Sequence, residues 1–263
     1  MKKYLYIYKT ELMSNMAYVF NIASGFISYL IHIIIFFYLW NYMYDDPSQI
    51  INGYTKSEMI WYVIITEVLW ISLGSRQFCK KINDDVKSGN ITYNLNKPYS
   101  YISYLLSNKL GEVTMKIVFY SIGGILVGLL FLHTIPHLNL LQVLLVVITI
   151  ILATIINIFL IMFIGLCSFF IEDANPFHWM YSKLILIFGI LFPIEYFPKV
   201  IAKVLNYSPV YVVSYGPARM FVNFSYVEAI KIIIAQIIYI MITYLLCLLI
   251  YKKGEKRLNV NGG

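Results

Sequence analysis

Long apolar segments without charged residues dominate the chain. Val19–Trp40 carries no charged side chain, and Ile117–Ile171 contains no Asp, Glu, Lys or Arg. An α-helix needs roughly 20 mostly apolar residues to cross a bilayer. The second segment is therefore long enough for two helices, and Pro136 marks the break because proline cannot continue a helix. The pattern predicts six spanning helices, over residues 19–40, 59–74, 113–132, 140–171, 179–193 and 230–250.

The first 18 residues have the spacing of an amphipathic helix. The apolar residues that recur at helical spacing are Met1, Leu5, Tyr8, Leu12 and Met16. Three lysines lie off that stripe, where they would face anionic lipid. The pattern predicts a helix over residues 1–18 that lies in the inner headgroup layer. The alternative is a short solvated leader before the first span.

A second amphipathic segment lies between the second and third predicted spans. Phe78, Ile82 and Val86 form an i, i+4, i+8 apolar stripe, and charged residues crowd the opposite face. Ser88-Gly89-Asn90 then supplies a helix stop. A short helix with both charge signs between two spans is either a docking element for a cytoplasmic partner or a plain interfacial turn.

The segment from Pro193 to Glu228 is apolar and aromatic but is interrupted by four prolines, at positions 193, 198, 209 and 217. We expect a re-entrant pair of short helices in the outer leaflet, whose freed backbone groups are satisfied by protein rather than lipid. An aromatic-rich interfacial loop is the alternative.

Composition and charge set the class and the orientation. Residues of the AVILMFWYC set make up 60% of the chain and charged residues 13%, which excludes a soluble enzyme and a disordered scaffold. Fifteen of the 20 Lys and Arg fall in the segments on the side of the two termini. The positive-inside rule therefore places both termini in the cytoplasm. The first apolar run is too long for a secretory signal core, so we expect it to stay as a span.

Candidate chemistry is sparse. The three cysteines are far apart and we expect no disulfide. Gly124 and Gly128 form a Gly-x-x-x-Gly pair suited to close helix packing and lack the lysine of a phosphate loop. We expect no catalytic residue, bound cofactor or metal. Glu67 is the one acid predicted inside the membrane, and it either lines a substrate path or is a neutral, hydrogen-bonded core acid.

The order of these features resembles the permease subunits of type-2 ABC exporters (ABC-2). The stretches that carry the resemblance are Val86-Lys-Ser-Gly89-Asn-Ile-Thr-Tyr-Asn-Leu95-Asn-Lys-Pro98, Gly53-Tyr-Thr, Phe169-Phe-Ile-Glu172-Asp173, Phe192-Pro193 and Phe197-Pro198. The likeness covers essentially the whole chain and implies a single all-α permease domain over residues 1–263. It also implies a bacterial cytoplasmic membrane.

The resemblance implies that ATP and Mg bind to a separate cytoplasmic ATPase. The complex would contain two copies of this ATPase and two permeases, which are identical or related. The resemblance assigns contact with the ATPase to a coupling helix and to a second, smaller site. The residues are Asp84, Asp85, Val86, Lys87, Gly89 and Asn90 for the helix, and Glu172 and Asp173 for the second site. The expected cargo is an amphipathic or lipid-like molecule, such as a drug, an antimicrobial peptide or a lipid, which the transporter would move outward. We expect membrane lipid as a partner and no nucleic acid.

An ATP-independent channel or ion-coupled carrier is the alternative function. It would need several intramembrane ionisable groups or inverted repeats. Glu67 is the only ionisable group of this kind that the sequence predicts. A membrane-embedded enzyme would need His and acids clustered within spans, which the sequence lacks.

Overall fold

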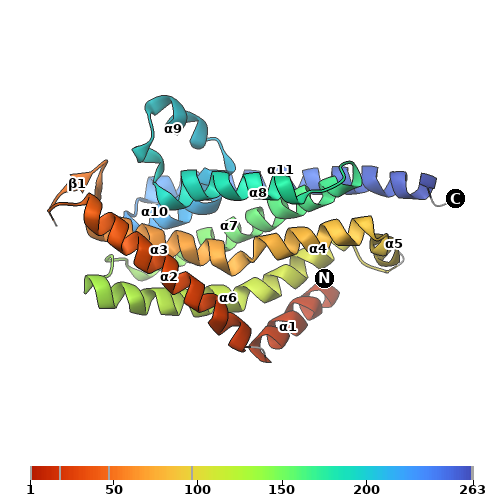
Figure 1. Cartoon of the computed structure of the whole chain (residues 1–263), viewed down its shortest axis with the longest axis horizontal. Coiled ribbons are helices and arrows are strands. Elements are labelled where there is room, and N and C mark those ends of the chain that lie inside the picture. Colours follow the sequence, from red (N-terminus) through yellow and green to blue (C-terminus); the bar gives the residue numbers. More distant parts are fainter. Residues whose placement is uncertain (1, 18, 47, 96, 262–263) are drawn as a thin grey trace.

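The computed structural model describes residues 2–17, 19–46, 48–95 and 97–261, and its architecture is all-α (Figure 1). Met1 and Tyr18, at the ends of the predicted interfacial helix, and Asn96, in the family-like stretch, lie outside these residues. Most of the long helices run along the long axis of an elongated bundle, as Figure 1 shows.

Five helical segments in the described part of the chain are long and apolar enough to cross a membrane. They correspond to the first, second, third, fourth and sixth predicted spans. The helices are α2 (Val19–Met43), α3 (Lys56–Leu73) with α4 (Ser75–Lys87), α6 (Tyr101–Leu132), α7 (Leu140–Leu166) and α11 (Tyr226–Asn261). The chain is therefore a multi-pass membrane protein.

The fifth predicted span, 179–193, is not among these five segments. Its residues belong to α8 (Asn175–Ile185) and to the π-helix η2 (Leu186–Leu191), which follow one another directly. α8 begins earlier than predicted because Pro176 occupies the first turn, where proline's missing N–H leaves no hydrogen bond unmade. A sixth crossing stays a prediction.

α3 is the centre of the bundle. It is buried along most of its length, and it lies against α2, α6, α7, η2 and α10 (Gly216–Val222). The predicted close packing at Gly124 and Gly128 is confirmed, because a Cβ at Gly128 would overlap the Trp61 ring of α3 and one at Gly124 would overlap the Tyr29 hydroxyl of α2. The small residues of α6 therefore let bulky aromatic side chains of α2 and α3 fill the interior.

One end of the bundle carries a hairpin and several short helices. β1 (Ile50–Ile51) and β2 (Tyr54–Thr55) pair antiparallel, and the two turn residues, Asn52 and Gly53, both have positive φ, as a type I′ turn requires. The proline-rich segment forms η3 (Ile194–Tyr196), α9 (Lys199–Leu205), η4 (Tyr211–Tyr215) and α10. α9 projects from the bundle in Figure 1. The depth of these short helices in the bilayer stays a prediction.

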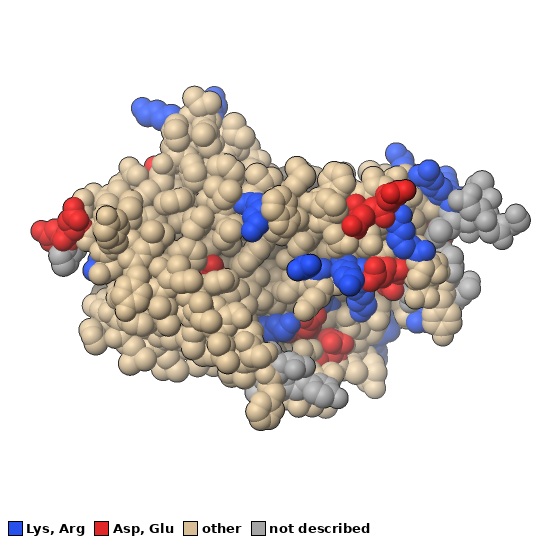
Figure 2. Space-filling model, viewed as in Figure 1, with Lys and Arg blue, Asp and Glu red and all other residues tan. Residues whose placement is uncertain are grey.

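The opposite end is formed by α4, α5 (Asn90–Leu95), the start of α6 and the end of α11, with α1 (Lys2–Ala17) packed along α6. α6 begins at Tyr101, before the predicted span at 113, and its first turns pack on α1 and contact α4 through Tyr101 and Lys109. Gly111 permits this approach, since a Cβ there would lie 2.6 Å from the carbonyl oxygen of Tyr8. Figure 2 shows that charged side chains gather at this end, which we call the charged end.

Candidate functional site

The candidate site is the helix α4, which continues α3 at the charged end. Gly74 separates the two helices, and its φ of 50° is a left-handed conformation that favours glycine. α4 ends at Lys87, and Gly89 follows with a φ of 74°. The helix stop predicted at Ser88-Gly89-Asn90 is therefore confirmed.

One face of α4 is fixed to the bundle. The predicted stripe of Phe78, Ile82 and Val86 is confirmed as buried. Ile82 packs on Gly165 of α7, where an added Cβ would lie 2.9 Å from the Ile82 Cβ. Asn83, buried beside this stripe, accepts a hydrogen bond of 3.2 Å from the backbone N–H of Ala174. These contacts hold α4 against α7 and against the turn before α8.

The opposite face of α4 is exposed and charged. The exposed charged side chains are Arg76, Lys80, Lys81, Asp84 and Lys87. The predicted coupling residues divide between the two faces. Asp84, Lys87 and Asn90 are exposed, Val86 is buried, and Asp85 is half-buried and accepts a 2.8 Å hydrogen bond from the Tyr101 hydroxyl.

The turn before α8 places Glu172 near the end of α4 and Asp173 near its first turns. Glu172 lines a depression of about 330 Å³ together with Val86 and Lys87, and the walls include residues of α11. Asp173 lines a pocket of about 780 Å³ together with Arg76 and Lys80. The structure thus brings these two acids to the charged face of α4, although they lie 85 (Glu172 from Lys87) to 97 (Asp173 from Arg76) positions from its residues in the sequence.

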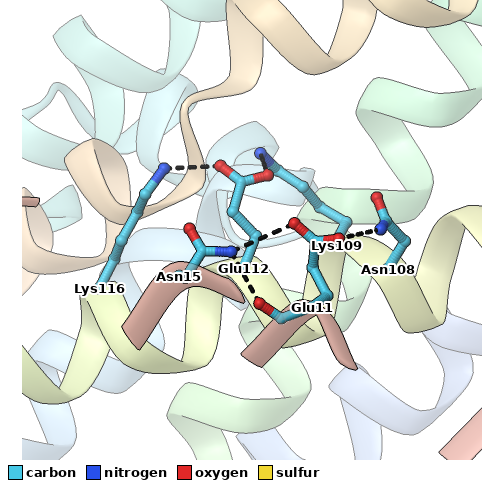
Figure 3. Close-up of polar contacts among 6 residues, drawn as sticks. All are labelled: Glu11, Asn15, Asn108, Lys109, Glu112 and Lys116. Atoms are coloured by element: carbon cyan, nitrogen blue, oxygen red, sulfur yellow. Dashed lines mark hydrogen bonds and ion pairs between the residues drawn. The ribbon is translucent and has the colours of Figure 1, made fainter. Parts of the chain in front are cut away.

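Polar side chains of α1 and α6 interact at the charged end (Figure 3), and one of them, Lys109, also contacts α4. Glu112 pairs with Lys109 at 2.8 Å and with Lys116 at 2.6 Å. Lys109 is 2% exposed, and its Nζ lies 5.3 Å from the ring centroid of Phe78 on α4. Glu11 of α1 accepts a 2.6 Å hydrogen bond from the Asn108 side chain. Sequence reasoning missed this network, although its i, i+3 and i, i+4 spacing was visible.

Glu67 lies inside the bundle. It is 1% exposed, and its carboxylate lies 3.2 Å from Nδ1 of His32 on α2. Glu67 is therefore a buried acid with a partner, and both its place on a substrate path and its neutral state stay predictions. Within the described residues no group of three or more His, Cys, Asp or Glu could hold a metal ion, and all three cysteines are free.

A second polar cluster, at the hairpin end, was also missed. The Glu195 carboxylate accepts hydrogen bonds from the hydroxyls of Tyr215 at 2.6 Å and Tyr54 at 3.2 Å, and lies 3.7 Å from Nε of Arg219. Burial raises the pKa of Tyr54 and of Tyr215, and the Glu195 charge raises each further. Both phenols therefore keep the proton that they donate, and the cluster ties the hairpin to η4 and α10.

These features, apolar crossing helices with a charged helix displayed at one end, are those of a multi-pass membrane protein. The sequence profile of the family described as "ABC-2 family transporter protein" matches residues 15–262. This match covers nearly the whole chain, so the chain belongs to the ABC-2 transporter family and is an ABC-2 type permease. No curated protein matches it significantly.

Proposed function

We propose that the chain is the membrane-spanning subunit of an exporter driven by a separate cytoplasmic ATPase, which docks on α4. The observation that carries this proposal is the exposed charged face of α4 with Glu172 and Asp173 at its edges. A permease of this family without a phosphate loop must receive conformational work through a surface contact. A helix fixed on one face and charged on the other is suited to that contact.

The structural connection from α4 to the centre of the bundle is short. α4 follows α3 after a single residue, Gly74, and α3 contacts α2, α6, η2 and α10. A displacement of α4 therefore acts directly on the central helix of the bundle. Rigid secondary elements in contact are the physical carriers of such coupling.

The complete transporter, in this proposal, contains two ATPases that bind ATP and Mg, and two permeases, identical or related. It lies in the bacterial cytoplasmic membrane with both termini in the cytoplasm and moves an amphipathic or lipid-like cargo outward. The basic side chains at the charged end support this orientation. Asp84, Lys87, Asn90, Glu172 and Asp173 are the exposed members of the proposed contact.

The test is purification of the tagged chain from native membranes in mild detergent, with identification of copurifying proteins by mass spectrometry. We expect a stoichiometric soluble protein with a phosphate-binding loop. The Asp84→Lys variant should no longer copurify with that protein. It should still insert into the membrane, since Asp84 is exposed and makes no core contact. Asp46→Lys, an exposed charge reversal beside the hairpin, is the matched control and should retain the copurifying protein.

Asp85→Lys is a less selective probe than Asp84→Lys, because it also removes the hydrogen bond with Tyr101. If the wild-type chain purifies alone and stays alone under crosslinking, the ATP-driven function is refuted. The ion-coupled alternative would then be tested by proton-coupled transport in a Glu67→Gln variant.

A further inference from the structure

The pocket of about 780 Å³ between the α3–α4 junction and the start of α8 has the features of a ligand site. Its volume lies within the range of about 300–1,000 Å³ typical of small-molecule sites. We propose that it binds the anionic head group of an amphiphile, whose apolar tail lies along Trp70 and Trp179.

The head-group side of the pocket is cationic. Arg76 and Lys80 line it, and neither forms an ion pair within the described residues. The one acid in the lining, Asp173, accepts hydrogen bonds from the backbone and side chain of Asn175. Behind the pocket, the Nζ atoms of Lys109 and Lys116 lie 3.7 and 3.8 Å from where a Cβ on Gly74 would be, and Glu112 offsets only one of these two charges.

The N-terminal turns of α4 and α8 supply the second observation. Both line the pocket, and helix N-termini favour negative charge. His178 also lines the pocket and is 5% exposed, but its unpartnered Nε2 is shielded from solvent and does not face the pocket space.

The other side of the pocket is suited to an apolar tail. Trp70 and Ile71 lie in the last turn of α3, and Trp179 lies in the first turns of α8. Tryptophan collects at the level of lipid head groups, where one edge of its ring is in water and the rest in lipid. The cations and the aromatic rings together fit one molecule with an acidic head and a hydrocarbon tail, rather than a free anion.

Binding at this pocket does not depend on an ATPase, whereas identifying the bound amphiphile as exported cargo rests on the proposed function. The test therefore uses the full chain alone in phosphatidylcholine nanodiscs. Brominated phosphatidylglycerol or brominated phosphatidylcholine is added at equal mole fraction, and quenching of tryptophan fluorescence is measured. Trp40 and Trp61 are 0% and 1% exposed, so Trp70 and Trp179 dominate the lipid-dependent signal.

We expect stronger quenching by the brominated phosphatidylglycerol. Since each basic residue near an anionic surface contributes about 1 kcal/mol, the Arg76→Gln/Lys80→Gln variant should lower the preference for the anionic lipid about 30-fold. Lys81→Gln/Lys87→Gln removes the same charge from α4 outside the pocket, and it should retain the preference. All four side chains are exposed, so both variants should fold.

Three results would overturn the proposal. Equal quenching by the two lipids would mean that the pocket does not recognise an anionic head group. Equal losses of lipid preference in the two variants would mean that the whole charged end, and not the pocket, attracts the anionic lipid. Inorganic phosphate, added at constant ionic strength, should not reverse the quenching; reversal would mean that the site takes a free anion. A failed lipid test would leave ATPase copurification unchanged, so the two failures are distinguishable.

Discussion

The buried ion pair of Lys109 and Glu112 allows a quantitative prediction for Glu112→Gln. The side chain of Lys109 is 3% exposed, and burial lowers its pKa to about 8 although Glu112 raises it. The substitution therefore leaves either an uncompensated charge or a neutral amine that has lost its partner inside the protein. Removing one partner of a buried pair costs about 3–5 kcal/mol. For a chain of this size each kcal/mol corresponds to about 2–4 °C, which predicts a fall in the unfolding temperature of roughly 6–20 °C.

The chain contains a matched control for this prediction. Lys231 and Glu228 on α11 have the same i, i+3 spacing and the same N–O distance, 2.8 Å, but their side chains are 61% and 41% exposed. Exposed pairs contribute about 0–1 kcal/mol. Glu228→Gln should therefore lower the unfolding temperature by less than about 4 °C. Both variants can be measured by tryptophan fluorescence during heating in detergent.

A third variant separates charge from packing. Lys109→Met combined with Glu112→Gln removes the stranded amine, and an apolar replacement of a buried pair is often neutral. The double variant should therefore recover most of the stability that Glu112→Gln loses. Equal losses in Glu112→Gln and Glu228→Gln, or no recovery in the double variant, would refute the reasoning that Lys109 is desolvated and needs Glu112 as its partner.

Three further predictions concern packing and hydrogen bonds. Gly165→Leu should push Ile82 away and release α4 from α7, lowering ATPase copurification while membrane insertion, measured by alkaline extraction, stays normal. Gly111→Val should separate α1 from α6, since its Cβ meets the α1 backbone, and faster limited proteolysis of the first 17 residues would report this. Tyr215→Phe should cost about 1–3 kcal/mol because Glu195 loses its 2.6 Å donor; an unchanged unfolding temperature would contradict it.

The crossing helices and the buried face of α4 could be predicted because they depend on local periodicity. Val19–Trp40 is apolar throughout, and Phe78, Ile82 and Val86 repeat at the helical period, so each signal lies within one short window. The helical turns of α6 before the predicted span at 113 could not be predicted, because they look like a loop until α1 covers them.

The relations between distant segments were beyond sequence reasoning. Arg76 and His178 lie about a hundred positions apart, and only the packing of α4 on α8 brings them to one pocket. Tyr54 and Glu195 meet in the same way at the hairpin end. A single sequence carries no signal for such pairs. A charged or aromatic residue at one position is explained by that position alone and does not indicate its distant partner.

The single-residue junction at Gly74 constrains how this protein can change over evolution. Each residue inserted into a helix rotates the rest of that helix by about 100° around its axis. One inserted residue between Leu73 and Ser75 would turn Lys81 into the buried place of Ile82 and Val86 into the exposed place of Lys87. Insertions and deletions should therefore be excluded from this junction in related chains, whereas the exposed residues Ser48 and Gln49 before β1 lie where the chain can vary in length.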